Sequence, residues 1–117
     1  VEAARARGAD DATWARIADA RADVAALRAM TAVMVSRIAR QDLPGPEGSL
    51  VKLRYGDVSQ RIHALGADVL GVDGLEFVAD DQALTYGYLA SLAATIGGGT
   101  SEIQRDIVAR RLLGLPR

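Results

Sequence analysis

Residues 97–105 read GGGTSEIQR, so three glycines run directly into the start of a helix. Each ordered glycine costs roughly 0.5–1 kcal/mol of backbone entropy relative to alanine, so the run indicates positive φ angles or a close backbone approach. Ser101 and Gln104 have the S-x-x-Q spacing of a capping box. The remaining N–H groups and the helix dipole favour an anion, phosphate above all. Two interpretations stay open: a junction that approaches a ligand, or a glycine-rich turn before an ordinary amphipathic helix, since the P-loop lysine is missing.

Downstream of this junction the sequence predicts a helix from Ser101 to Leu113. Gly114 and Pro116 then give the expected stop, a glycine just past the helix and a proline soon after. The apolar positions predicted to face inward are Ile103, Ile107, Val108 and Leu112.

Two longer helices precede it. Asp10 or Asp11 can cap the first, which stops at the proline- and glycine-rich residues 42–46, and the second runs from Ser49 to Gly71. The short linker makes the two helices antiparallel neighbours. Their apolar seams alternate spacings of three and four: Ile17, Ala20, Val24, Leu27, Thr31, Met34 and Ile38 in the first, and Val51, Tyr55, Val58, Ile62, Leu65 and Val69 in the second.

The segment between these helices and the glycines is less regular. Residues 72–79 are predicted to be loop, and Asp80 or Asp81 can cap a shorter helix with Leu84, Tyr88 and Leu92 on one face. No convincing strand alternation or repeat is present. The sequence therefore predicts an all-α protein, an up-and-down bundle of the four-helix type.

The amino-acid composition excludes several kinds of function. The 117 residues suit one domain, and 14 basic against 15 acidic residues give no electrostatic argument for nucleic acid or an anionic membrane. There is no cysteine, which excludes disulfides and thiolate metal sites, so no metal is expected. With no run of about eighteen apolar residues and no signal-peptide layout, we expect a cytoplasmic protein that does not enter a membrane.

Residues 95–117, TIGGGTSEIQRDIVARRLLGLPR, resemble the C-terminal signature of the acyl-CoA dehydrogenases, flavoenzymes that oxidise acyl-CoA thioesters. These enzymes end in a four-helix bundle. The resemblance implies that residues 1–117 are this C-terminal helical domain with most of its first helix missing. Residues 1–8 read as the last two turns of a helix closed by Gly8, which suggests that the natural chain begins further upstream.

The resemblance also implies binding residues. Thr100, Ser101 and Glu102 stand where the family contacts FAD, and Gly99 stands where the acyl-CoA thioester is approached. Asp68 and Gly71 fall in a second family segment, residues 68–72, which contacts FAD across the dimer interface. The usual pattern there has a glutamine and paired glycines, so helix core is an equally good interpretation of this segment.

Two other family features are incomplete here. A phosphate-binding arginine is normally followed by an aromatic residue, but Arg5 and Arg7 lack one and fit solvated helix-end cations. The family's catalytic glutamate lies two residues before the motif threonine in one branch, where this chain has Gly98, and on the first bundle helix in others. Glu2 lies at the wrong end of that helix, so no catalytic base is identified.

The other reactive or aromatic residues have structural interpretations. His63 is offset from its seam and suits a surface or groove, and Tyr86, Tyr88 and Trp14 suit packing. The basic stripe near the end suits a solvated face or subunit contact and consists of Arg105, Arg110 and Arg111.

The family resemblance implies oxidation of an acyl-CoA to its 2,3-enoyl form with FAD as acceptor. Electrons would pass to an electron-transfer flavoprotein, and the assembly would be a homo- or hetero-tetramer. Two alternatives remain: a non-catalytic supporting subunit of a hetero-oligomeric dehydrogenase, and a non-enzymatic helical interaction module.

Overall fold

The computed structural model describes residues 1–41, 45–75 and 84–116, and these residues are mostly helical, without a strand among them. The all-α prediction is therefore confirmed. None of the described helices is long and apolar enough to cross a bilayer. In chain order the elements are α1 (Glu2–Ala6), α2 (Asp11–Gln41), α3 (Glu47–Leu70), the 3-10 turn η1 (Gly71–Leu75), α4 (Leu84–Ala93), α5 (Ser101–Ile107) and the π-helical stretch η2 (Val108–Leu112).

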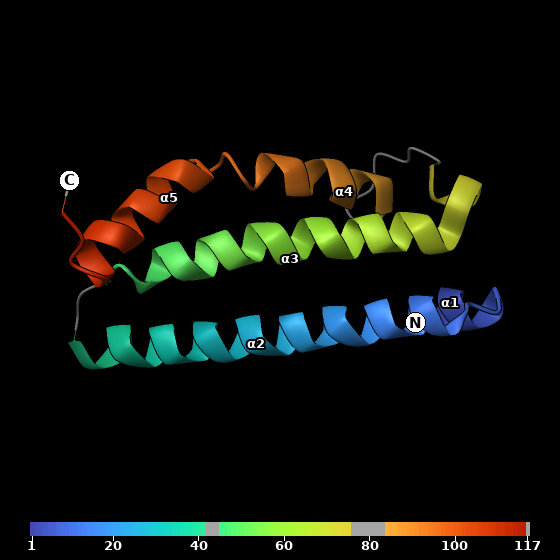
Figure 1. Cartoon of the computed structure of the whole chain (residues 1–117), viewed down its shortest axis with the longest axis horizontal. Coiled ribbons are helices and arrows are strands. Elements are labelled where there is room, and N and C mark those ends of the chain that lie inside the picture. The colour runs from blue at the N-terminus through green and yellow to red at the C-terminus, as the bar shows by residue number, and fades with distance from the viewer. Residues whose placement is uncertain (42–44, 76–83, 117) are drawn as a thin grey trace.

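The helices form three layers in a body of 48 × 27 × 26 Å. Figure 1 shows α3 in the middle, with α1 and α2 on one side and α4 and α5 on the other. α3 runs antiparallel to α2, as the short linker predicts, and α4 and α5 return along α3 toward its beginning. Because α3 is covered on two sides, it needs two inward faces.

The helix boundaries largely follow the predicted signals. Asp10 caps α2, since its Oδ1 accepts a hydrogen bond of 2.8 Å from the Thr13 N–H. α3 begins at Glu47, two residues earlier than predicted, and ends before Gly71, where φ is +58°. The predicted caps Asp80 and Asp81 and part of the proline-rich linker lie outside the described residues.

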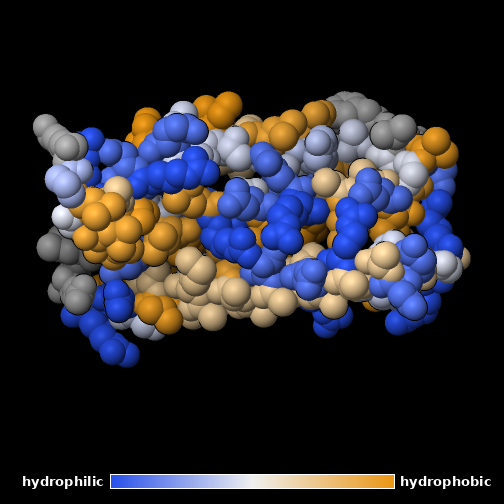
Figure 2. All heavy atoms as spheres, in the orientation of Figure 1, coloured by the Kyte–Doolittle hydropathy of each residue, from blue (hydrophilic) through white to orange (hydrophobic). Residues whose placement is uncertain are grey.

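The α2 seam is confirmed. Ile17 is buried, the other six predicted seam residues are half-buried, and Trp14 packs beside Ile17 and Leu65 as predicted. Ion pairs border the contact with α3. Figure 2 shows hydrophilic residues across the middle of this face of the molecule. Residues early in α2 pair with residues late in α3, and the reverse, as expected for antiparallel helices. The pairs are Arg16 with Asp68, Asp23 with Arg54 and Arg61, and Arg37 with Glu47.

The α3 seam was predicted correctly except at Tyr55, which is 52% exposed. The second inward face of α3, toward α4, is built from small or polar residues, so apolar periodicity did not reveal it. A Cβ on Gly66 would lie 2.7 Å from Leu84 Cδ1, and a Cβ on Gly87 would lie 2.4 Å from His63 Nε2. These glycines let α4 approach α3 closely.

The face of α4 that carries Leu84, Tyr88 and Leu92 is not its buried face. Leu84 is half-buried, but Tyr88 and Leu92 are exposed, and Ser91 is buried instead. Tyr86 is exposed too, so packing roles for both tyrosines are not observed. Beyond Leu84, α4 buries small residues because these allow the close approach to α3, and its large apolar residues Leu89 and Leu92 point outward.

The predictions for the segment after α3 and for the last helix need correction. The loop predicted for residues 72–79 begins with the 3-10 turn η1, and residues 76–79 lie outside the described part. In the last helix Ile107 and Val108 are half-buried, but Ile103 and Leu112 are exposed and Gln104 is buried. The helix widens at its end, where the Leu113 N–H donates to the Val108 carbonyl.

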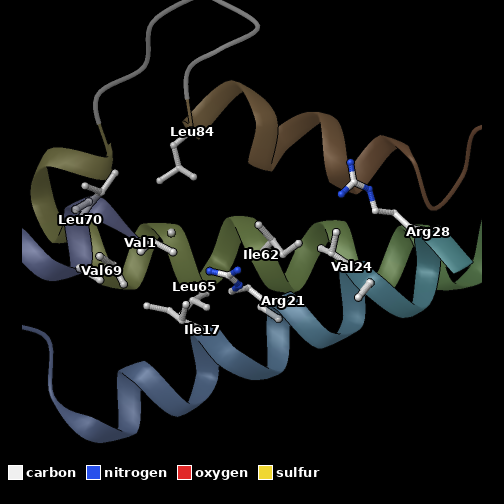
Figure 3. A pocket seen from close by; sticks show the side chains of 15 residues that line it. Val1, Ile17, Arg21, Val24, Arg28, Ile62, Leu65, Val69, Leu70 and Leu84 are labelled. Carbon is white, nitrogen blue, oxygen red and sulfur yellow. The ribbon is translucent and has the colours of Figure 1, made fainter.

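An apolar groove of about 740 Å³ runs between α1, α2, α3 and the start of α4. Figure 3 shows Ile17, Val24, Ile62 and Leu65 along it, with the Arg21 side chain extending into the view between α2 and α3. The described part of the chain buries few large apolar side chains. The inward faces of α2 and α3 thus remain partly open along this groove.

Candidate functional site

The glycine turn joins α4 to α5 beside the beginning of α3. Gly98 and Gly99 have φ angles of +72° and +104°, a region that side chains with a Cβ rarely adopt, whereas Gly97 does not. A Cβ on Gly99 would also lie 2.8 Å from Gln104 Nε2. Two of the three glycines are therefore required by the backbone conformation, as the glycine run predicted.

The capping arrangement differs from the prediction. Thr100, not Ser101, is the N-cap, and its Oγ1 accepts a long hydrogen bond of 3.5 Å from the Ile103 N–H. Gln104 does not complete a capping box, because its Nε2 donates to the Gly98 carbonyl at 2.7 Å. The positive φ angles fold the turn back over α5, and this brings the Gly98 carbonyl within reach of the glutamine.

Three backbone N–H groups of this segment have no acceptor among the described residues. They belong to Gly98, Thr100 and Ser101, whereas the Gly97 and Gly99 N–H groups bond to the Ala93 and Ile96 carbonyls. Thr100 and Ser101 are half-buried. The turn can therefore offer backbone donors to an oxygen-rich ligand.

Glu102 supplies a negative charge next to these donors. Its side chain is exposed, and one oxygen lies 3.6 Å from Arg105 Nη1. Hydrogen bonds from its own backbone N–H and from the Thr100 side chain lower its pKa, with smaller contributions from the charges of Arg105 and Lys52. Glu102 is thus a carboxylate near neutral pH and can accept hydrogen bonds from hydroxyl groups.

Lys52 of α3 holds the turn through hydrogen bonds. The sequence analysis did not predict this role. From α3 its Nζ donates to the Thr95 carbonyl at 3.1 Å and also to the Gly99 carbonyl. The signal that could have revealed it is a lysine directly beside the seam residue Val51 on a helix packed on two sides.

Asp68 and Gly71 lie at the other end of α3. Asp68 is sixteen residues after Lys52, which corresponds to about 24 Å along the helix axis. Asp68 is exposed and pairs with Arg16 at 2.6 Å, and Gly71 is exposed. One chain therefore does not bring these two residues together with Thr100, Ser101 and Glu102.

The remaining predicted polar residues lie apart from the turn. Arg7 pairs with Asp73, and Arg5 is exposed. His63 is half-buried between α3 and α4, and its Nδ1 lies 2.7 Å from the Ser59 carbonyl. In the basic stripe Arg110 pairs with Asp106 at 2.8 Å. No group of residues suited to hold a metal ion occurs in the described part of the chain.

The fold and the turn together define a helical-bundle domain that exposes backbone donors on a glycine turn. The family model described as the C-terminal domain of acyl-CoA dehydrogenase matches residues 2–113, so the chain belongs to the acyl-CoA dehydrogenase family.

Two curated relatives carry the name acyl-CoA dehydrogenase IpdE1. The protein from Mycolicibacterium smegmatis is 38% identical over 85 residues, covering 68% of this chain and 21% of its own length. The one from Mycobacterium tuberculosis is 34% identical over 96 residues, covering 78% of this chain and 24% of its own length. The chain thus spans less than a quarter of these relatives. No solved structure matches it.

Proposed function

We propose that the chain is the C-terminal helical domain of an FAD-dependent acyl-CoA dehydrogenase that oxidises an acyl-CoA to its 2,3-enoyl form. The observation that carries this proposal is the glycine turn: Gly98 and Gly99 have positive φ angles and lead into the N–H groups of Thr100 and Ser101, which have no acceptor among the described residues. Together with family membership, this favours a ligand-binding turn over an ordinary connection.

The residues of the turn fit the chemistry of a flavin nucleotide. The Thr100 and Ser101 N–H groups can donate to carbonyl or phosphate oxygens, and the Glu102 carboxylate can accept from hydroxyls. Gly99 has no side chain to obstruct the acyl-CoA thioester. FAD, when bound, would accept the β-hydride of the substrate.

The α-proton must be removed by a residue outside this turn. Gly98 occupies the position where one branch of the family keeps a glutamate, and it has no side chain that could act as a base. We infer that the base belongs to another segment or subunit of the assembled enzyme.

The groove suggests how the domain is completed. Val1 and Ala4 of α1 line it together with Ile17 and Leu65. We propose that residues 1–117 form most of the C-terminal helical domain and that α1 is the end of its first bundle helix, whose earlier turns fill the groove. Covering the groove would bury the inward faces that α2 and α3 leave open.

Assembly and partners follow from the same proposal. The outer side of α4 and the following turn expose Leu89, Leu92 and Ile96, an apolar surface suited to subunit contact. In a homo- or hetero-tetramer, Asp68 and Gly71 of one subunit would reach the FAD held by Thr100, Ser101 and Glu102 of another. The enzyme would be cytoplasmic and pass its electrons to an electron-transfer flavoprotein.

A second candidate is a supporting subunit that does not catalyse the reaction itself. The observation that favours it is the segment Asp68–Gly71, where an aspartate and one glycine stand in place of the family's glutamine and paired glycines. In that case a partner subunit would supply the base and complete the FAD site.

Purification of the full-length protein alone separates the two candidates. A catalytic subunit should hold one flavin per chain, visible in its absorbance spectrum, and turn over an acyl-CoA with an artificial electron acceptor. Flavin and turnover that appear only after a partner is co-expressed would support the second candidate. Absence of flavin from every preparation would favour a non-enzymatic helical module.

Gly99→Val tests the turn directly. The branched side chain would be strained at φ +104° and would crowd Gln104, so flavin occupancy should fall. Gly97→Ala is the matched control, since its Cβ would make only an ordinary contact, 3.5 Å from the Ala93 carbonyl. Unchanged flavin content in Gly99→Val would contradict the proposed function.

A further inference from the structure

Lys52 joins the central helix to both ends of the glycine turn. Its Nζ donates to the carbonyl of Thr95, which precedes the glycines, and to that of Gly99, which ends them. A lysine ammonium is a compact charge with three donors, so it can hold two carbonyls that converge on one point. The Lys52 side chain is half-buried and the contact spans 43 and 47 residues of sequence.

A second bond holds the same turn from α5. Gln104 of α5 donates to the Gly98 carbonyl. In the sequence this carbonyl lies between the Thr95 and Gly99 carbonyls, which accept from Lys52. Carbonyls and N–H groups of one peptide point in opposite directions, because the peptide unit is planar and trans. Fixing the Gly99 carbonyl therefore fixes the direction of the Thr100 N–H, one of the groups without an acceptor in the described chain.

We propose that Lys52 is the positioning residue of this turn: it fixes the Gly99–Thr100 peptide so that the Thr100 N–H is presented to the bound cofactor. The proposal rests on the proposed function for the identity of the ligand, FAD. Lys52 itself points at the carbonyl side of the turn, so it acts through the backbone and is not a catalytic residue.

The test compares three variants of the full-length protein. Lys52→Met keeps most of the aliphatic stem and removes the ammonium, and Lys52→Arg keeps the charge and donors in a planar fork. Arg61→Met is the control, because it removes a cation from the same helix by breaking only the pair with Asp23. For each protein the measurements are the dissociation constant of FAD from the deflavinated form, amide hydrogen exchange of residues 98–101, and the thermal midpoint.

Lys52→Met should bind FAD about tenfold or more weakly, the effect of losing charge-assisted hydrogen bonds that orient a ligand contact. The Gly99 amide, which donates to the Ile96 carbonyl, should exchange faster in Lys52→Met than in the wild type. Lys52→Arg should recover part of the affinity, and Arg61→Met should bind like the wild type. A Lys52→Met protein with wild-type affinity and exchange would overturn the proposal. So would equal losses in Lys52→Met and Lys52→Arg, or in Lys52→Met and Arg61→Met, since these would indicate general destabilisation.

The experiment also distinguishes an error in the proposed function from an error in the role of Lys52. If the wild type binds no FAD, the cofactor assignment is wrong, and the exchange of residues 98–101 still decides whether Lys52 orders the turn. Unchanged exchange in Lys52→Met then overturns the positioning role as well.

Discussion

Gln104 Nε2 donates to the Gly98 carbonyl at 2.7 Å, and this bond ties α5 back onto the turn that precedes it. The side chain of Gln104 is almost fully buried, at 6% exposure, although it lies on a helix whose isoleucine at position 103 faces solvent. The bond is possible because Gly99 has no Cβ, which would otherwise lie 2.8 Å from Nε2. A polar side chain thus takes the inward place that apolar periodicity assigned to Ile103.

Removing this bond should destabilise the fold. Gln104→Leu has similar volume but no donor, and it should lower the free energy of unfolding by about 1 kcal/mol because the Gly98 carbonyl loses its partner. Urea denaturation followed by circular dichroism measures the change. Ile103→Gln, an exposed substitution next to it, should change the free energy by less than about 0.5 kcal/mol. Equal effects of the two substitutions would contradict the role of the bond.

The three glycines should differ in their tolerance of alanine. Gly97→Ala should be close to neutral, Gly98→Ala should cost about 1 kcal/mol through its positive φ alone, and Gly99→Ala should cost about 2 kcal/mol or more. The last adds a steric contact with Gln104 to the backbone strain. Thermal or chemical unfolding of the three variants gives the order, and a Gly97→Ala protein as unstable as Gly99→Ala would refute it.

His63 and Gly87 should be energetically coupled. A Cβ on Gly87 would lie 2.4 Å from His63 Nε2, and the ring is held by its bond to the Ser59 carbonyl. Gly87→Ala should therefore cost about 1–3 kcal/mol through overpacking, despite the better helix propensity of alanine. His63→Ala makes room, so the double variant should be more stable than the sum of the two single changes predicts. A double-mutant cycle measures the coupling, and strict additivity would exclude the contact.

The ion pairs between α2 and α3 should not contribute equally. Asp23 is only 17% exposed and binds both Arg54 and Arg61, so Asp23→Ala should cost about 1 kcal/mol. Arg16→Gln breaks a pair in which both side chains are more than half exposed, and it should cost less than about 0.5 kcal/mol. Urea denaturation at low and high salt checks both values. A larger loss of unfolding free energy in Arg16→Gln than in Asp23→Ala would show that burial does not determine which ion pair contributes more.

Asp10 should make the stability of α2 depend on pH. Hydrogen bonds from the Thr13 side chain and backbone N–H lower the pKa of Asp10 below its usual value of 3.8. Its stabilising contribution is therefore fully present above that value and disappears as the pH falls through the lower, folded-state pKa. Asp10→Asn keeps a capping oxygen without the charge, so the difference in thermal midpoint between it and the wild type should shrink below about pH 4. A difference that stays constant from pH 7 to pH 3 would contradict this.

The sequence by itself determined the helices, the antiparallel pairing of α2 and α3, the inward face of α2 and the positive-φ glycine turn. These features depend on local chemistry or on a pattern repeated along one helix, such as an Asp cap, a proline-rich stop or a seam with spacings of three and four. The family resemblance was carried by a continuous stretch around that turn, and the match over residues 2–113 confirms it.

Only the tertiary structure decided which residues meet between helices. It brought Lys52 and Gln104 to carbonyls of the turn, buried Ser91 in place of Tyr88 and Leu92, and separated Asp68 from Lys52 and the turn along α3. The reason is that α3 packs against helices on two sides, and its second face uses small and polar residues for close approach. Such contacts leave no apolar period in the sequence, because they depend on the relative placement of helices that are far apart along the chain.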